Sequence, residues 1–260
     1  MDIDISEFHL DKYWWVFLLG IGIIALVVRI LFARMEARRG LGSLRQAGGE
    51  TLDKNVLKER KRQLLQESKQ APEPDILRGL ALGAFMKAGR SADVNKIDAE
   101  VSFPEVAAGL ARQWDVRGHD EAIETLSRLL SLSSTGEMTA HWNASAKSFD
   151  KHTKAEAKKL KKDAAEVVDL SAWDLARAVN VAEWSYLIGY ISRDELSSCF
   201  NLAVYISREH YANWPDYGLA FLVGRDMAGF DNEEMAYHLS WFLGESRSNE
   251  TWKIWQRVPF

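Results

Sequence analysis

The residues with the most chemical potential are an aspartate and two arginines in the C-terminal half of the 260-residue chain. Asp174 and Arg177 are three residues apart, so a helix would place them on one face. Arg225 follows in a later apolar segment that could pack beside them. Guanidinium groups bind carboxylate and phosphate oxygens in pairs. The set therefore predicts either a charged pocket for an anionic ligand or a buried Asp–Arg network that fixes helix packing. The floor of such a pocket would be formed by Trp173, Trp184 and Trp214.

Histidine and cysteine patterns give no support for metal binding or catalysis. The six histidines show none of the HExxH, HxH or paired His/Cys spacings that hold zinc. GxSxG, P-loop and GxGxxG motifs are absent from the sequence as well. Cys199 lies in a helical segment with no histidine nearby, which favours a buried structural thiol. We therefore expect no metal and no cofactor, and the sequence favours a role other than catalysis.

The elements that must position these side chains read as helices. Apolar residues recur with a helical period, and long alternating strands are absent. Ser192-Arg-Asp-Glu195 has the form of a capping box, and Asp231 or Asn232 is placed to cap a later helix. We predict an all-α domain on which the aromatic segment 252–260 docks. The expected helices are 54–69, 75–87, 103–114, 120–132, 147–168, 172–187, 193–210, 214–228 and 232–243.

Tryptophan is frequent in this chain, with 10 residues, and this invites the interpretation of a site where ligands stack. Hydrophobic core is the favoured alternative, because each tryptophan buries roughly 150–250 Å² and a helical domain needs that area. The tryptophans expected in the core are Trp173, Trp184, Trp214, Trp241, Trp252 and Trp255.

Lysines recur every three or four residues on the helix expected at 147–168, which predicts one basic stripe. The stripe could contact anionic lipid, where each lysine near the surface contributes about 1 kcal/mol, or an acidic partner. Acidic residues between the lysines favour a solvated helix face instead. The stripe consists of Lys147, Lys151, Lys154, Lys158 and Lys161.

Residues 13–32 form an apolar segment of membrane-spanning length whose only charge is Arg29. Its large aliphatic and phenylalanine side chains favour insertion by roughly 4 to 8 kcal/mol in total. Arg29 opposes this by at most about 3 kcal/mol and can reach the lipid headgroups, while Trp14 and Trp15 suit the opposite interface. We predict a transmembrane helix. The alternatives, a cleaved signal peptide and a buried core helix, are disfavoured by the acidic tail 1–12 and by apolar side chains on both faces.

Basic residues crowd the C-terminal flank of this segment, which predicts that the following chain faces the cytoplasm. Residues 1–12 would then form a short extracytoplasmic tail. Residues 33–70 would form a polar, partly helical stalk, and residues 71–260 an all-helical cytoplasmic domain. A lone cysteine agrees with this location. One expected partner is therefore the lipid bilayer, contacted through residues 13–32.

Several different short motifs rich in tryptophan, glycine and charged residues are spread along the C-terminal half: WDLAR at 173–177, Trp184, Gly189-Tyr190, Trp214 and Gly224-Arg225. Over about residues 76–260 they resemble the bacterial family called domain of unknown function 1266. The resemblance implies an all-helical intracellular domain, hence a bacterial inner-membrane location for the anchored chain. It implies no enzyme activity. Glu183, the pair 227–228 and Phe260 depart from the family pattern.

Three functional hypotheses from different classes follow. A net charge of −4 with 27% charged residues describes an ordinary soluble surface, so we expect no nucleic acid partner. The first hypothesis is a membrane-tethered module that binds another protein, in an immunity or adaptor role, since tethering raises effective concentration. The second is a sensor or enzyme for a small anionic ligand, using Asp174, Arg177 and Arg225; a structural role in the envelope is a third. A polar cavity around these residues would favour the second, and an exposed apolar patch elsewhere the first.

Overall fold

Helix α9 (Ser171–Leu187) is the central element of the computed structural model, which describes residues 54–131, 149–244 and 252–260. Regular structure in these residues is helical throughout, which confirms the all-α prediction. The other elements are α2 (Lys54–Glu67), α3 (Pro74–Leu82), α4 (Ala84–Ala88), α5 (Phe103–Trp114), α6 (His119–Leu130), α8 (Lys151–Lys159), the short 3-10 helix η4 (Ala164–Glu166), α10 (Arg193–His210), α11 (Trp214–Met227), α12 (Glu233–Phe242) and α13 (Ile254–Arg257).

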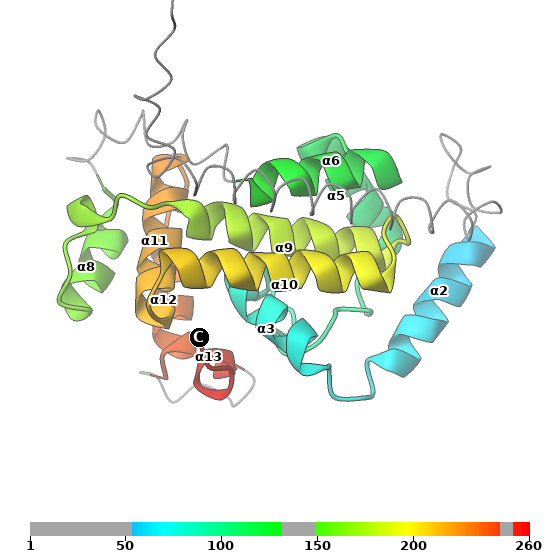
Figure 1. Cartoon of the computed structure of the whole chain (residues 1–260), viewed down its shortest axis with the longest axis horizontal. Coiled ribbons are helices and arrows are strands. Elements are labelled where there is room, and N and C mark those ends of the chain that lie inside the picture. Colours follow the sequence, from blue (N-terminus) through cyan, green and yellow to red (C-terminus); the bar gives the residue numbers. More distant parts are fainter. Residues whose placement is uncertain (1–53, 132–148, 245–251) are drawn as a thin grey trace, which may run out of the picture. The chain divides into compact units, whose positions relative to one another are not determined.

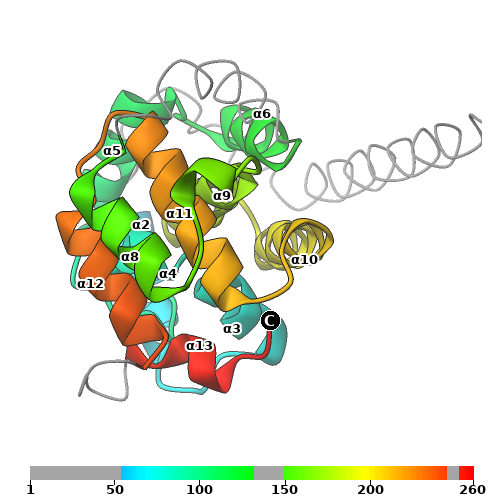
Figure 2. The ribbon, with the colours of Figure 1, turned by 90° about the vertical axis from the view of Figure 1, so that its left-hand side faces the viewer.

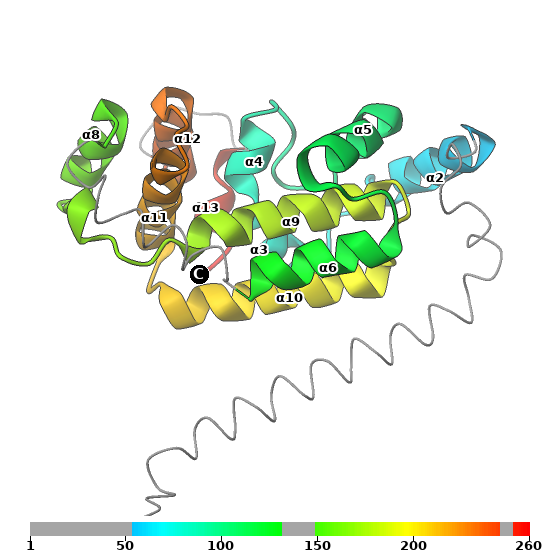
Figure 3. The same cartoon turned by 90° about the horizontal axis from the view of Figure 1, so that it is seen from above.

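Helix α9 is buried on nearly all sides because its sequence presents apolar or small residues all round. It packs against α10, α6, α11, α5, α3 and α4. Figures 1 and 3 show α10 running alongside α9, and α6 contacts both of these helices. At the N-terminal end of α9, α11 contacts both α8 and α12 (Figure 2). The residues predicted to form a site lie on this central helix and on α11.

Local sequence signals predicted several helix ends correctly. The capping box at the start of α10 is confirmed: Glu195 N–H donates to Ser192 Oγ at 3.2 Å, and Ser192 N–H donates to Glu195 Oε2 at 2.7 Å. At α12, Asp231 Oδ1 accepts the N–H of Glu233 at 2.9 Å. The side chain of Asn232 is instead buried. Of the two candidate residues, Asp231 is therefore the one whose side chain caps the start of α12.

Two expected helices differ from the structure. The helix expected at 75–87 is divided into α3 and α4 at Gly83, where an added Cβ would lie 2.5 Å from Val179 Cγ1 of α9. The break therefore lies where the chain meets α9, a tertiary contact that a local pattern does not contain. The helix expected at 147–168 is reduced to α8 and η4. Lys161 has a φ of 56°, a left-handed backbone that cannot continue an α-helix.

Helix α2, which falls in the segment expected to be a stalk, packs on the C-terminal end of α9. Leu64 is buried, with 2% of its surface exposed. Arg60 donates to the backbone oxygen of Tyr186 at 2.7 Å, and the Tyr186 hydroxyl donates to Glu67 at 3.1 Å. The helical part of the predicted stalk is therefore fastened to the rest of the domain.

The predicted anchor, residues 13–32 with Trp14, Trp15 and Arg29, lies outside the described residues, as does Lys147. Among the helices that the structure does describe, none combines the length and the apolar character needed to cross a bilayer.

The aromatic C-terminal segment docks on the helical core, as predicted. The indole N–H of Trp255 donates to the backbone oxygen of Ala81 at 2.7 Å, and its ring stacks on that of Trp214 with centroids 4.8 Å apart. Trp214 in turn donates to the oxygen of Val258 at 2.8 Å. These contacts join α11 and α13 to α3 through buried rings whose N–H groups are satisfied.

Candidate functional site

Asp174 and Arg177 form the predicted pair on α9. The Arg177 guanidinium donates to Asp174 Oδ1, and the carboxylate is fully buried. The same guanidinium lies over two indole rings, 4.9 Å from that of Trp173 and 5.6 Å from that of Trp114. Burial, with the positive charge of Arg128 as a smaller cause, lowers the pKa of Arg177 to about 10. Arg177 is therefore still charged at neutral pH, and it is neutralised by Asp174.

Arg225, on α11, belongs to the same neighbourhood through aromatic contacts. Its guanidinium lies 5.1 Å from the centre of the Phe230 ring, and that ring is 5.8 Å from the ring of Trp173. Burial lowers the pKa of Arg225, while Asp231 and Glu234 act in the opposite direction. Two neighbouring rings thus lie between two cations, in the order Arg177, Trp173, Phe230 and Arg225. We call these four residues the arginine–aromatic row.

Three polar atoms at the row favour a ligand. Arg177 Nε, Arg225 Nη1 and the indole nitrogen of Trp114 are buried and have no hydrogen-bond partner. Buried donors of this kind are rare in folded proteins and are satisfied by water or an anion where one can enter. Against this, the Asp174 carboxylate already binds Arg177, and aromatic rings cover the guanidinium groups. The geometry therefore fits a structural network better than an open pocket.

The three tryptophans proposed as a pocket floor have separate sets of contacts. Trp173 contacts the arginine–aromatic row. The guanidinium of Arg90 lies over the ring of Trp184, 4.8 Å from the ring centre. Trp214 stacks on Trp255 in the C-terminal aromatic cluster. These contacts do not join the three rings into one floor, because each meets a different cation or ring.

A second buried charged cluster was not predicted from the sequence. Lys87 of α4 and Glu183 of α9 form an ion pair with 1% of each side chain exposed. Glu183 Oε1 also accepts the backbone N–H of Asp98 at 3.0 Å, and Arg90 donates to Asn180 beside it. The available signal was the presence of Asn180 and Glu183 in the mainly apolar second half of α9. Their partners come from a distant segment, which no spacing rule identifies.

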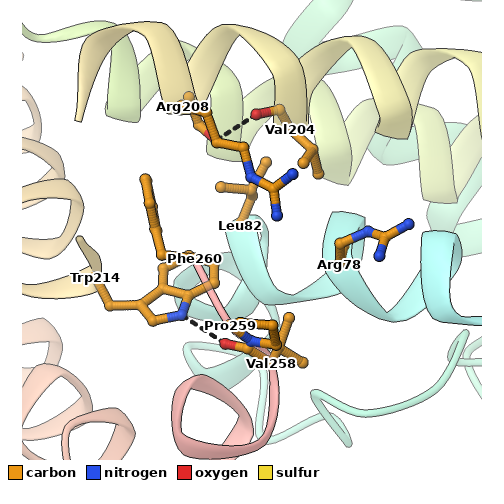
Figure 4. A pocket seen from close by; sticks show the side chains of 9 residues that line it. Arg78, Leu82, Val204, Arg208, Trp214, Val258, Pro259 and Phe260 are labelled. Atoms are coloured by element: carbon orange, nitrogen blue, oxygen red, sulfur yellow. Dashed lines mark hydrogen bonds between the residues drawn. The ribbon is translucent and has the colours of Figure 1, made fainter. Parts of the chain in front are cut away.

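A first surface hollow lies between α3, α10 and the C-terminal segment, as Figure 4 shows. Its walls include Arg78, Arg208, Trp214 and Phe260. The volume is about 10 Å³, room for one water molecule. This place is too small for a metabolite, and its aromatic residues are engaged in docking the C-terminal segment.

A second hollow, of about 320 Å³, opens over α12; we call it the α12 hollow. Three of its rings are close together: His238 lies 5.1 Å from Trp241 and 5.9 Å from Trp252, and the two indoles are 5.5 Å apart. The rings of His238 and Trp252 are nearly parallel, with 9° between their planes. Its volume falls in the range of small-ligand and side-chain pockets. It is lined by Ala88, Ser91, Glu234, Tyr237, His238, Trp241 and Trp252.

Exposure and charge distinguish this hollow from the core. Tyr237 is 60% exposed, and the Glu234 side chain is 65% exposed with its carboxylate 4.0 Å from His238 Nε2. Burial lowers the pKa of His238, which Glu234 offsets only in part. The imidazole is therefore uncharged at neutral pH. Three tryptophans predicted to be core are instead half-buried: Trp241 and Trp252 at this hollow, and Trp184 on α9.

The remaining predicted sites lie on the surface or are inert. Lys151, Lys154 and Lys158 are exposed on α8, and Lys161 follows the helix end in a left-handed conformation, which interrupts the stripe. Cys199, expected to be buried, is half-buried. Desolvation still raises the pKa of its thiol to about 12, so the thiol stays protonated. Within the residues that the structure describes, no group of three or more His, Cys, Asp or Glu side chains could hold a metal ion.

Comparison with known proteins agrees with the motif resemblance. Residues 109–260 match the model of the family described as protein of unknown function (DUF1266). No curated protein and no solved structure matches the chain. The matched region begins within α5 and contains α9, the arginine–aromatic row and most of the α12 hollow. Since it covers more than half of the 260 residues, the chain belongs to the DUF1266 family.

Proposed function

We propose that this chain is a binding module that binds another protein at the exposed side of α12, where the α12 hollow lies. The observation that carries the proposal is the α12 hollow, where Tyr237, Trp241 and Trp252 surround a volume of about 320 Å³. Tyrosine and tryptophan are the side chains most enriched at the energetic centres of protein interfaces. A solvated tyrosine beside half-buried indoles is otherwise an unfavourable exposure of apolar area. A partner that covers this face would remove that area from water.

A membrane tether is part of the proposal. The length, the apolar character and the basic C-terminal flank of residues 13–32 support a single-pass anchor in a bacterial inner membrane. The N-terminus would then be outside and the helical domain in the cytoplasm. Holding the domain at the bilayer raises its effective concentration toward a partner that is also at the membrane. A role as an immunity protein or an adaptor is consistent with such a tethered module.

Two exposed tyrosines allow a matched test of binding. Tyr237 lies at the α12 hollow and is 60% exposed, whereas Tyr205 lies on α10 and is 62% exposed. We expect one stoichiometric protein to co-purify with the crosslinked full-length chain and with Tyr205→Ala. Recovery with Tyr237→Ala should fall by about tenfold, the effect of losing one central interface side chain. Equal recovery with both variants would refute a binding surface at α12.

The location has its own test. Membranes from cells that express the chain should retain it after washes with salt and alkali and release it only into detergent. A reporter that matures only in the cytoplasm, fused after Phe260, should be active. Release of the intact chain without detergent would refute the tether and leave the α12 surface unaffected.

Binding of a small anionic ligand is the second candidate function, favoured by the unpartnered N–H groups at Arg177, Arg225 and Trp114. Titration with inorganic phosphate tests it directly. Saturable stabilisation of the chain, lost in Arg225→Ala, would support an anion site at the arginine–aromatic row. Absence of any effect at millimolar phosphate would leave the row as a structural network.

A further inference from the structure

We infer that the α12 hollow binds a positively charged side chain, lysine or arginine, presented by the protein partner. The inference rests on the proposed function and specifies the chemistry of the contact. Three independent features of the hollow carry it: the arrangement of its rings, the sign of its charge, and the state of its histidine.

The ring arrangement provides faces for a cation. The faces of indole and phenol rings carry negative electrostatic potential, and an ammonium or guanidinium group is attracted to them. Within the α12 hollow, the rings of His238, Trp241 and Trp252 are 5.1–5.9 Å apart. Tyr237 adds a fourth ring to the lining. A group inserted here would meet more than one aromatic side chain, as in the aromatic sites that recognise ammonium ligands.

The charge around the hollow is negative. Among the described residues that line it, Glu234 is the one with a charged side chain, since the others are alanine, serine, tyrosine, tryptophan and a neutral histidine. Asp231 and Glu233 are exposed at the start of the same helix. Arg225, whose guanidinium lies over the Phe230 ring, interacts with the charges of Asp231 and Glu234 but does not line the hollow. A basic side chain entering the hollow would therefore gain both ring contacts and a carboxylate.

The histidine adds an aromatic wall without adding charge. His238 is 4% exposed, and burial lowers its pKa, so that it is neutral where a cation would bind. Its ring is nearly parallel to that of Trp252, which fixes both planes in one orientation. A hollow whose rings are already in place costs little ordering when a side chain enters. Such a wall favours a cation over an acidic or a polar uncharged side chain.

The probes are small molecules that carry the charged group alone. The full-length chain, labelled with 5-fluorotryptophan and kept in mild detergent, is titrated with arginine amide and lysine amide, and with norleucine amide as a control lacking the side-chain charge. Fluorine NMR resonances of Trp241 and Trp252 are assigned from the variants Trp241→Phe and Trp252→Phe. We expect saturable shifts of these two resonances with the basic amides and at least fivefold weaker binding of norleucine amide.

Charge-matched variants sharpen the test. Glu234→Gln should weaken arginine amide binding threefold to tenfold, whereas Glu233→Gln, an exposed neighbour that does not line the hollow, should leave it unchanged. Both variants should keep the unfolding midpoint of the parent chain. Equal binding of norleucine amide, or no shift with any probe, would overturn the inference. If the probes fail while Tyr237→Ala still loses the protein partner, only the cation contact is refuted. If the probes bind but no protein partner is recovered, the proposed function is refuted.

Discussion

The buried carboxylate of Asp174 is paired with the nearby guanidinium of Arg177. Arg177 donates to it and is itself 20% exposed, so the pair is neutral but largely withdrawn from water. A charge in such a place is costly when its counter-ion is removed. This makes the pair a requirement of the fold, whatever binds at the surface.

We predict that Arg177→Met lowers the free energy of unfolding by about 3 kcal/mol, because it removes the cation that neutralises Asp174. Arg225→Ala should lower it by less than about 1 kcal/mol, since that guanidinium contacts an exposed ring. Urea denaturation of both variants measures the difference. Losses of similar size would show that Arg225 belongs to the same buried network.

A pH-dependent contact joins α6 to α10. His119 Nε2 lies 2.7 Å from Glu195 Oε1. This hydrogen bond is the largest cause that raises the pKa of His119. Burial alone would raise the pKa of Glu195, but hydrogen bonds from His119 and Ser192 outweigh it and lower that pKa. The histidine therefore stabilises the fold below its unfolded pKa of about 6.5. That contribution is lost as pH rises through the raised folded pKa.

Glu195 behaves in the opposite way. Its contribution is present above the ordinary glutamate pKa of 4.5 and is lost as pH falls through the lowered folded pKa. The pair should therefore stabilise most between about pH 4.5 and 6.5. We predict that His119→Gln costs about 1 kcal/mol at pH 5.5 and little at pH 9, measured by denaturation at both values. A loss independent of pH would show that the pair is not ionised.

The sequence predicted residue contacts only where they are local. Asp174 and Arg177 were paired correctly because three residues separate them on a helix. The pair of Lys87 and Glu183 joins α4 to α9 and leaves no periodic trace. Tryptophan type alone could not separate the buried Trp255 from the half-buried Trp241, since exposure depends on what packs across each ring.

At the scale of elements, α3 and α10 approach closely at a glycine. A Cβ added at Gly79 would lie 2.2 Å from the ring of Phe200. We predict that Gly79→Ala lowers the free energy of unfolding by about 1–3 kcal/mol through overpacking, although alanine is the better helix former. Arg78→Ala, the adjacent and half-exposed position, is the control and should cost less than 1 kcal/mol, roughly the limit for such sites. A Gly79→Ala variant more stable than its parent would contradict this packing.

Helix boundaries were predictable where the chain carries its own signals. The capping box begins α10 at Arg193, and a proline near its start marks α5. The ends of α3 and α8 were not predicted. Helix α3 ends at Gly83, which lies against α9, and the chain after α8 has a left-handed backbone at Lys161. Local propensity is a weak determinant where tertiary contacts decide the conformation.

At the scale of the whole chain, the residues from Gly49 to Phe260 form one compact unit that contains the described core. We predict that a variant starting at Gly49 stays in solution without detergent and unfolds in one cooperative transition. The complete chain should require detergent. Circular dichroism during urea titration checks the first expectation. Aggregation of the shortened chain would show that the N-terminal residues contribute to folding.

The most direct measurement of the central claim, that α12 carries the binding surface, is photo-crosslinking in living cells. A photoreactive amino acid replaces Tyr237 in one full-length chain and Tyr205 in another, two positions of nearly equal exposure. The account predicts a discrete crosslinked product containing a second protein from position 237 and none from position 205. No product from position 237, or the same product from both, would contradict it.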